Sequence, residues 1–343
     1  MKKILTFSIV AIILATGNLQ ATNWNVNVGK FQFVVVTPSA TDLTVTDAYL
    51  ASAYLEYGER LPAILTIPNT ITFNGNTLTV KKIGNGFVIP NYGAHPTNAE
   101  DILELYISEG YEMIDGYFDN CPNMYLVSLP STLKSIGYYC FNNDLALTSI
   151  TIPANVETIS QSAFSNTGLT SVIIPESVTN LGGYAFDNCV NLTNANIPST
   201  LQTVPAAIFR GTAITSIEIP NAVTEIKNLA FANCTSLQQV KVNWQTPLTN
   251  IYSNIFSGVT TANVTLIVPC GTKELYEAAN VWKDFIVTEE EGCSINTAIA
   301  ETGLTPAQVA GYYNLLGKKL DAAPDTGIYI IVYDNGKVEK VLK

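Results

Sequence analysis

A phenylalanine recurs along the middle of this chain at almost constant spacing. Its intervals are 23, 23, 22, 23 and 22 residues, and a proline column keeps step with it at 23, 22, 23 and 22. Two residue types that share one period indicate a repeat array, in which each repeat packs on its neighbours. The phenylalanines are Phe118, Phe141, Phe164, Phe186, Phe209 and Phe231, and the prolines are Pro130, Pro153, Pro175, Pro198 and Pro220.

The length of the repeat narrows the fold to a solenoid of short coils. A period in the low twenties is too short for a pair of helices or a propeller blade, and it matches one coil of a leucine-rich solenoid. Leu169, Val172 and Ile174 are spaced as the inward residues of a short strand, and Pro175 ends that strand because it has no N–H to donate to a ladder. Strands stacked about 4.8 Å apart are expected to form a continuous parallel sheet on one face.

The second half of each coil returns the chain to the next strand. A second inward pair, such as Val178 and Leu181, is followed by a predicted short helical or 3₁₀ turn that ends in the phenylalanine. Two residues later stands Asn or Gly, which indicates a tight turn with positive φ or a side-chain amide that satisfies backbone groups. This column contains Asn120, Asn143, Asn166, Asn188, Gly211, Asn233 and Gly258.

The predicted fold is therefore α/β leaning all-β, with a leucine-rich array over residues 97–258, a parallel stacked sheet on one face and short helical turns on the other. Residues 22–96 are expected to form a β-rich cap with a partial coil. Residues 259–292 predict a closing strand and a helix, in which Tyr276, Ala279, Trp282 and Phe285 fall near helical spacing. A linker over 293–308 and a small β unit over 309–343 follow, and the Asp-Asn-Gly run at 334–336 predicts a hairpin.

The first 21 residues have the pattern of an export signal. Lys2 and Lys3 precede an apolar run, and a cut between small residues fits after Ala21. The run of about twelve apolar residues is shorter than the roughly twenty that span a bilayer, so no transmembrane segment is expected. The chain carries 17 Lys+Arg against 28 Asp+Glu; without Lys2 and Lys3 the balance is 15 against 28, a net charge of −13. A nucleic-acid partner would require a basic patch, and the sequence shows none.

The six cysteines raise the question of disulfides in an exported chain. Cys121, Cys189 and Cys234 each follow the Asn column, and Cys140 precedes Phe141, so these four are expected to be free thiols in the core. Cys189 and Cys234 are two coils apart, roughly 10 Å, which exceeds disulfide reach. A bridge between Cys270 and Cys293, outside the array, stays open.

Catalytic and metal sites find little support in the residue pattern. His95 is the only histidine, so neither a zinc site nor a serine triad is expected. The acidic runs Glu289 to Glu291 and Glu100 with Asp101 are interpreted as solvated linker charge, and no glycine-rich phosphate loop precedes a helix. The sequence predicts no enzyme and no cofactor.

The repeat unit strongly resembles that of BspA-like leucine-rich repeat surface proteins of Bacteroidetes-type bacteria. The matching positions are Ile174, Pro175, Val178, Leu181, Ala185, Phe186, Asn188 and Cys189. The closing segment at 267–285 is also similar, although Cys270 replaces the usual small residue. The tail, with its Tyr-Asn-Leu and Gly-Lys-Lys elements, resembles the C-terminal sorting domain of type IX secretion and is short for it. The resemblance implies adhesion or the binding of host proteins, without one shared ligand.

The candidate binding surface consists of two outward columns on the predicted strand face. They mix hydroxyl and amide groups with one aromatic, Tyr106, which favours a protein or peptide partner over a glycan; a merely solvated face is the alternative. The first column is Tyr106, Ser128, Thr151, Ile173, Asn196, Glu218 and Lys241. The second is Glu104, Leu126, Ser149, Ser171, Asn194, Ser216 and Gln239.

Three functions are consistent with these observations. The first is an exported binding or adhesion protein of the cell surface or extracellular space, with the periplasm as another location, that contacts a host or surface protein. The second is a glycan-capturing surface protein of a nutrient-uptake system. The third is a scaffold without a ligand of its own. The oligomeric state stays open.

Overall fold

The computed structural model describes residues 10–11, 22–28, 31–37, 48–55, 63–73, 76–84, 101–115, 118–249, 251–291, 309–314, 318–324, 328–333 and 338–342. The chain divides into two compact units, Met1–Glu289 and Glu290–Lys343. Most of the expected export signal, the linker at 293–308, His95 and Glu100 lie outside the described residues. The first unit holds the repeats and the second holds a small sheet.

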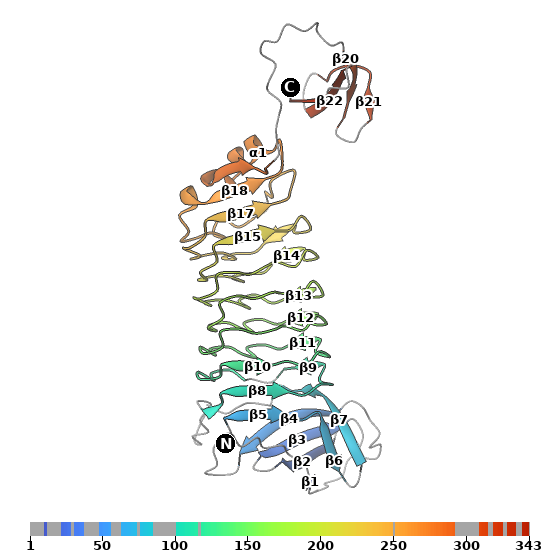
Figure 1. The fold of residues 1–343 in the computed structure, drawn as a ribbon, viewed down its shortest axis with the longest axis vertical. Coiled ribbons are helices and arrows are strands. Elements are labelled where there is room, and N and C mark those ends of the chain that lie inside the picture. Colours follow the sequence, from blue (N-terminus) through green and yellow to red (C-terminus); the bar gives the residue numbers. More distant parts are fainter. Residues whose placement is uncertain are drawn as a thin grey trace. The chain divides into compact units, whose positions relative to one another are not determined.

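The coils of the first unit stack one on another, with some strands before the proline positions and others after them; the coils of Pro153, Pro175 and Pro198 form a strand only after the proline (Figure 1). We call these two sides the first face and the second face. Strands of the first face are β5 (Ile64–Ile67), β8 (Glu104–Ile107), β10 (Leu126–Ser128), β15 (Ser216–Ile219), β17 (Gln239–Val242), β18 (Thr265–Val268) and β19 (Ile286–Glu289). Those of the second face are β7 (Asn76–Ile83), β9 (Met113–Ile114), β11 (Ser135–Ile136), β12 (Thr158–Ile159), β13 (Asn180–Leu181), β14 (Thr203–Val204) and β16 (Glu225–Ile226).

The N-terminal part of the unit is β-rich, as expected. Strands β1 (Val10–Ala11), β2 (Thr22–Val28), β3 (Phe31–Thr37) and β4 (Ala48–Leu55) pair antiparallel in sequence order. β4 then pairs parallel with β7, whose other partners are β6 (Thr70–Phe73) and β9. The cap thereby extends the sheet of the second face.

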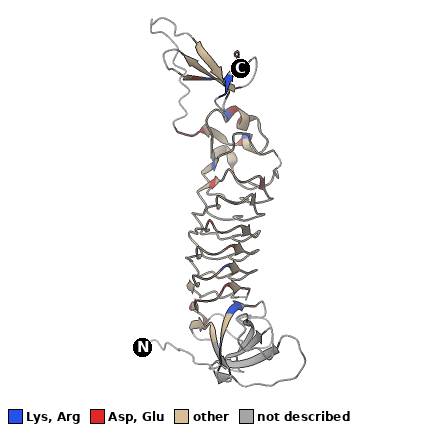
Figure 2. Cartoon of the chain, turned by 90° about the vertical axis from the view of Figure 1, so that its right-hand side faces the viewer, with Lys and Arg blue, Asp and Glu red and all other residues tan. Residues whose placement is uncertain are grey.

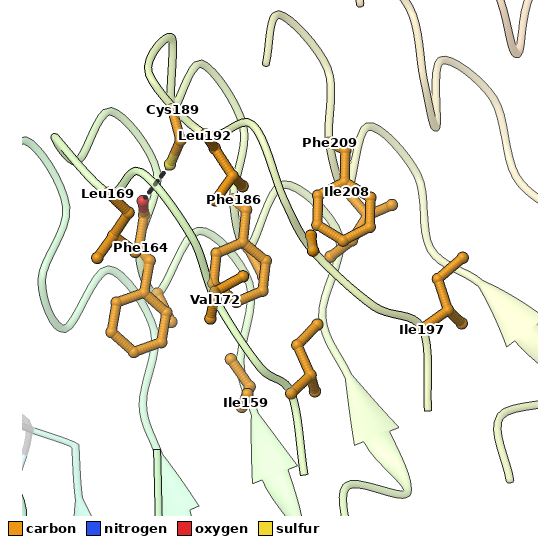
Figure 3. Close-up of a cluster of buried hydrophobic side chains, with 14 of the residues drawn as sticks. Ile159, Phe164, Leu169, Val172, Phe186, Cys189, Leu192, Ile197, Ile208 and Phe209 are labelled. Carbon is orange, nitrogen blue, oxygen red and sulfur yellow. Dashed lines mark hydrogen bonds between the residues drawn. The ribbon is translucent and has the colours of Figure 1, made fainter. Parts of the chain in front are cut away.

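The core is a stack of phenylalanine rings, one from each coil, as the period predicts. From Phe118 to Phe256, successive ring centroids lie 5.4 to 6.3 Å apart and the ring planes stay within 19° of parallel. Phe118 to Phe231 are fully buried, and inward aliphatic residues such as Val172 surround the rings (Figure 3). Residues that are 22 or 23 positions apart are therefore direct neighbours.

The turns at the phenylalanine edge confirm the Asn/Gly column. Its asparagines have φ between 55° and 63°, and Gly211 and Gly258 have φ of 69° and 81°. The sequence did not reveal a second left-handed column two residues before each phenylalanine from Phe141 to Phe231, with φ of 50° to 62°. No helix forms in the described residues 118–249; the expected helical turns are single turns whose N–H groups also bond to the next coil, as Phe164 does to the Ala185 carbonyl at 2.9 Å. The second column is Tyr139, Ser162, Tyr184, Ala207 and Leu229.

The expectation of a continuous sheet is wrong on both faces, and on the second face the break lies between the Pro175 coil and the Pro198 coil. On the second face, β13 and β14 are not paired. In neighbouring coils the ladder is closed by bonds such as Gly182 N–H to Ile159 O, 2.7 Å, and Lys227 N–H to Val204 O, 3.0 Å. Pro205 occupies the same repeat position and has no N–H, so the bond to Leu181 cannot form.

The first face is interrupted over a longer stretch, because no strand ladder joins β10 to β15. Within that stretch an isolated bridge, Ser171 with Asn194, joins the Pro175 coil to the Pro198 coil. The Asn196 side chain replaces the backbone ladder: its Oδ1 accepts from the Ile174 N–H at 2.7 Å, and its Nδ2 donates to the Ile174 carbonyl at 2.9 Å. Side chains thus substitute for the backbone ladder between these coils.

The end of the array closes with less helix than expected. A 3₁₀ turn, η2 (Thr261–Asn263), precedes β18, and the helix α1 (Lys273–Ala278) stops because Ala279 is extended and Val281 has a φ of 73°. A separate 3₁₀ turn, η3 (Trp282–Asp284), leads into β19. Tyr276, Trp282 and Phe285 are nevertheless buried, so the aromatic pattern marks the core and not one helix.

The second unit is a small antiparallel sheet, as predicted. Its strands are β20 (Val309–Tyr313), β21 (Lys319–Leu320), β22 (Ile328–Tyr333) and β23 (Val338–Leu342), in the order β21-β20-β22-β23. β22 and β23 pair antiparallel, and the expected turn at 334–336 lies outside the described residues.

Candidate functional site

The predicted outward columns lie at the surface of the first face. None of their side chains is buried, because they alternate with inward residues along each strand, as Glu218 alternates with the buried Ile217 and Ile219. The half-buried members are Tyr106, Asn196, Lys241, Glu104 and Leu126. The exposed members are Ser128, Thr151, Ile173, Glu218, Ser149, Ser171, Asn194, Ser216 and Gln239.

Three members of the first column share a hollow of about 580 Å³. Tyr106, Ser128 and Thr151 line it, together with Glu109 and Asn155. The Tyr106 hydroxyl donates to Glu104 Oε2 at 2.9 Å. Glu109 and Asn155 were missed in the sequence because they follow the strand at the corner of the coil, where no inward and outward alternation marks them.

Glu109 gives this hollow a negative charge. Its carboxylate accepts from the Ser131 N–H at 3.0 Å and from the Ser131 hydroxyl at 2.8 Å, one coil away. The Ser131 backbone bond is the main cause that lowers the pKa of Glu109, with the hydroxyl bond next. The hollow therefore keeps its anionic group at neutral pH.

A second hollow of about 440 Å³ lies further along the same face. Asn196 and Glu218 line it with Glu176, and Glu218 accepts from Asn243 Nδ2 at 2.8 Å and lies 3.5 Å from Lys241 Nζ. Both polar ends of the Asn196 amide are occupied by Ile174, as described above. Asn196 is therefore engaged in holding two coils together, and its availability to a partner is reduced.

Ile173 lies on the coil between the two hollows. Its side chain is 79% exposed, the largest exposed fraction among the large hydrophobic residues in the described part of the chain. An exposed apolar side chain between two hollows is a contact that a partner can bury, since interface energy concentrates in a few central residues.

The repeat family matches a known model. Residues 111–238 and 202–279 match the BspA type leucine-rich repeat region, which occurs in six copies. Residues 111–279 of the solenoid are therefore similar to BspA-type leucine-rich repeats. No curated protein matches the chain.

Among solved structures, one shares the fold at a TM-score of 0.50, and others are similar at lower scores. A leucine-rich repeat protein from Bacteroides ovatus has 20% identity and a TM-score of 0.50, covering 69% of each chain. The T. pallidum leucine-rich repeat protein has 21% identity and a TM-score of 0.48, covering 61% of this chain and 88% of its own. A leucine-rich cell surface protein from Faecalibacterium prausnitzii has 18% identity and a TM-score of 0.30, covering 80% and 95%.

The cysteines of the array are core residues, as predicted. Cys121, Cys140, Cys189 and Cys234 are free and buried. Cys189 Sγ donates to the Phe164 carbonyl at 3.1 Å (Figure 3), and burial raises the pKa of its thiol to about 11. Cys270 is disulfide-bonded, and Cys293 lies outside the described residues. The buried thiols are poor nucleophiles because they stay protonated at neutral pH.

One acidic residue departs from the sequence interpretation, and a second, Asp144, lies in the core, which the sequence analysis did not address. Glu289 is not in a linker: it ends β19, and its carboxylate accepts from the Gly271 N–H at 2.7 Å. Asp144 is fully buried in the column otherwise filled by small residues such as Cys121, whose N–H donates to it at 2.8 Å. Burial is the main cause that raises the pKa of Asp144 well above its ordinary value.

The described part of the BspA-type array offers no metal centre and no spanning helix. No three His, Cys, Asp or Glu side chains gather there in a way that could hold a metal ion. None of the helices described is long and apolar enough to cross a membrane.

Proposed function

We propose that the chain is an exported cell-surface binding protein whose first face contacts a protein partner through Ile173 and the two hollows beside it. The observation that carries this proposal is the exposed Ile173 side chain between hollows that Tyr106, Ser128, Thr151 and Glu218 line. The similarity of residues 111–279 to the BspA type leucine-rich repeat region supports a binding role in general. Export rests on the predicted N-terminal signal.

The charge of the face favours a basic partner segment. Glu109 and Glu176 carry acidic side chains at the corners of the two hollows, and each accepts hydrogen bonds from a serine of the next coil. Glu218 is balanced by Lys241. Figure 2 shows that charged positions are sparse along the coils. The two acidic corners therefore have few charged neighbours, and their sign agrees with the net charge of −11 of the chain. A lysine- or arginine-bearing segment complements them.

The partner is tested by pull-down from host matrix extract with the mature chain, followed by binding measurements on purified variants. Ile173→Asp is expected to weaken binding at least about tenfold, because the substitution places a charge at a contact that must be desolvated. Leu145→Asp is the matched control, since Leu145 is 63% exposed and lines neither of these two hollows. Equal binding by Ile173→Asp and the parent would contradict the proposal.

The scaffold alternative predicts a different result. Asn196, Thr170 and Thr193 bind neighbouring coils through their side chains, so part of this face serves the fold. If the parent retains no extract protein, and Thr151→Arg behaves in the same pull-down like Thr224→Arg on the second face, the first face is a solvated surface.

A further inference from the structure

A groove of about 620 Å³ crosses the second face over β13 and β14. It lies where the ladder is broken, because Pro205 offers no N–H to Leu181. Leu201 and Pro205 are buried and lie at its floor, whereas Gln161 and Gln202 are exposed at its rim. Its volume falls within the range of about 300–1,000 Å³ that small-molecule sites occupy.

Two small residues leave space for this groove. The position three residues before each phenylalanine is Tyr138 and Gln161 in the two preceding coils, and it becomes Gly183 and Ala206 at the broken junction. Both Gly183 and Ala206 line the groove. The sequence of two consecutive coils thus removes the backbone bond and the side-chain bulk at the same place.

The lining is polar and nearly uncharged. Amides come from Gln161, Asn180 and Gln202, and hydroxyls come from Thr179 and Thr203. Each of these groups can both donate and accept hydrogen bonds. Lys227 is the one charged side chain in the lining, and no carboxylate contributes to it. Such a lining suits a ligand rich in hydroxyl groups better than a charged one.

Tyr184 adds an aromatic ring that is held in place. The Arg210 guanidinium lies 5.4 Å from the ring centroid. Arg210 is itself fixed, because its Nε and Nη2 donate to the two carboxylate oxygens of the buried Asp187 at 2.7 and 2.6 Å. A ring ordered before binding costs little entropy on association and offers an apolar body to the C–H face of a sugar.

We propose that this groove binds a neutral oligosaccharide, with Tyr184 stacking on one sugar ring and the amides of Asn180 and Gln202 pairing with its hydroxyls. The site lies on the second face and is independent of the protein contact proposed for the first face.

The test uses the full mature chain and a panel of neutral gluco-, manno- and galacto-configured hexasaccharides. Saturation-transfer NMR identifies a binder, and calorimetry measures its affinity. Tyr184→Ala is expected to weaken binding about tenfold, while Tyr184→Phe keeps most of it. The alanine is compatible with the fold because Ala207 occupies the same left-handed position in the next coil.

Tyr139→Ala is the matched control. Tyr139 has the same repeat position and a φ of 54°, and it does not line the groove, so its loss is expected to leave binding unchanged. Three results would overturn the proposal: no hexasaccharide bound at about 10 mM, which corresponds to less than about 3 kcal/mol of affinity, equal affinity of Tyr184→Ala and the parent, or retention of an extended peptide in place of every sugar. Ile173→Asp should leave sugar binding intact, which separates this site from the first face.

Discussion

Truncation of Phe186 to alanine is expected to lower the free energy of unfolding of the solenoid by about 3–5 kcal/mol. The ring is fully buried and lies between two others, 5.4 Å from Phe164 with planes 4° apart and 5.9 Å from Phe209 with planes 18° apart. Burial of a phenylalanine contributes about 1.5–3 kcal/mol. Each aromatic pair adds about 0.5–1.5 kcal/mol, so the two estimates agree.

The loss is measured by urea unfolding followed by tryptophan fluorescence. Trp24, Trp244 and Trp282 all belong to the first unit, so the signal reports the solenoid and not the C-terminal sheet. Val190→Ala is the control: Val190 is 65% exposed in the same region, and its truncation should change the free energy by less than about 0.5 kcal/mol.

Hydrogen exchange tests the one-dimensional character of the array. Each coil contacts only its neighbours, so protection should fall near Phe164, Phe186 and Phe209 and persist at the cap. A Phe186→Ala chain that loses less than about 1 kcal/mol would refute the assignment of this column to the core. Uniform loss of protection over the whole unit would instead refute the nearest-neighbour reasoning.

Three further predictions concern the turns, a buried acid and the thiols. Asn166→Ala should lower the free energy of unfolding in urea by about 1–2 kcal/mol, because alanine tolerates a φ of 56° less well than asparagine and loses the 2.8 Å bond to Asn143. Asn166→Gly should lower it by less, since Gly211 occupies the same left-handed position in another coil. Burial raises the pKa of Asp144 in the folded state. The resulting loss in the free energy of unfolding is therefore absent below the unfolded-state pKa of about 3.9 and grows as pH rises towards the folded-state pKa. Asp144→Asn should therefore gain stability relative to the parent between about pH 4 and pH 7, and a constant difference over that range would contradict the reasoning. Native Cys189, with its pKa raised to about 11, should resist iodoacetamide at neutral pH and react once urea unfolds the chain; rapid labelling of the native protein would refute its burial.

The core could be predicted from the sequence because residues one repeat period apart lie at equivalent positions of adjacent coils. Phe164 and Phe186 are 22 residues apart in the chain and stack directly, so the column of phenylalanines is also the column of contacts. The same reasoning placed Asn166 and Gly211 at left-handed turns. The second left-handed column was not foreseen, because Tyr184, Ala207 and Leu229 share no residue type that marks positive φ.

The broken junction was not predicted, because it depends on pairs of residues in adjacent coils. Pro205 fits one coil and becomes disruptive only opposite Leu181, whose carbonyl needs a donor. Asn196 resembles an outward polar residue until its amide bonds to Ile174 in the preceding coil. For the same reason the helix over 273–285 divides: the backbone at Ala279 and Val281 bends so that Tyr276 and Trp282 both pack on the array end.

The sequence alone determined the repeat, the buried phenylalanine column and the outward residues of the first face, since these depend only on the period and on burial. The tertiary structure alone decided where the coils lose their backbone ladder, which outward residues serve the fold and where hollows open. Hydrogen bonding between coils requires a donor and an acceptor at matching heights, and the groove beside Tyr184 requires Pro205, Gly183 and Ala206 to meet across one junction. Those coincidences belong to neighbouring coils together and to neither coil by itself.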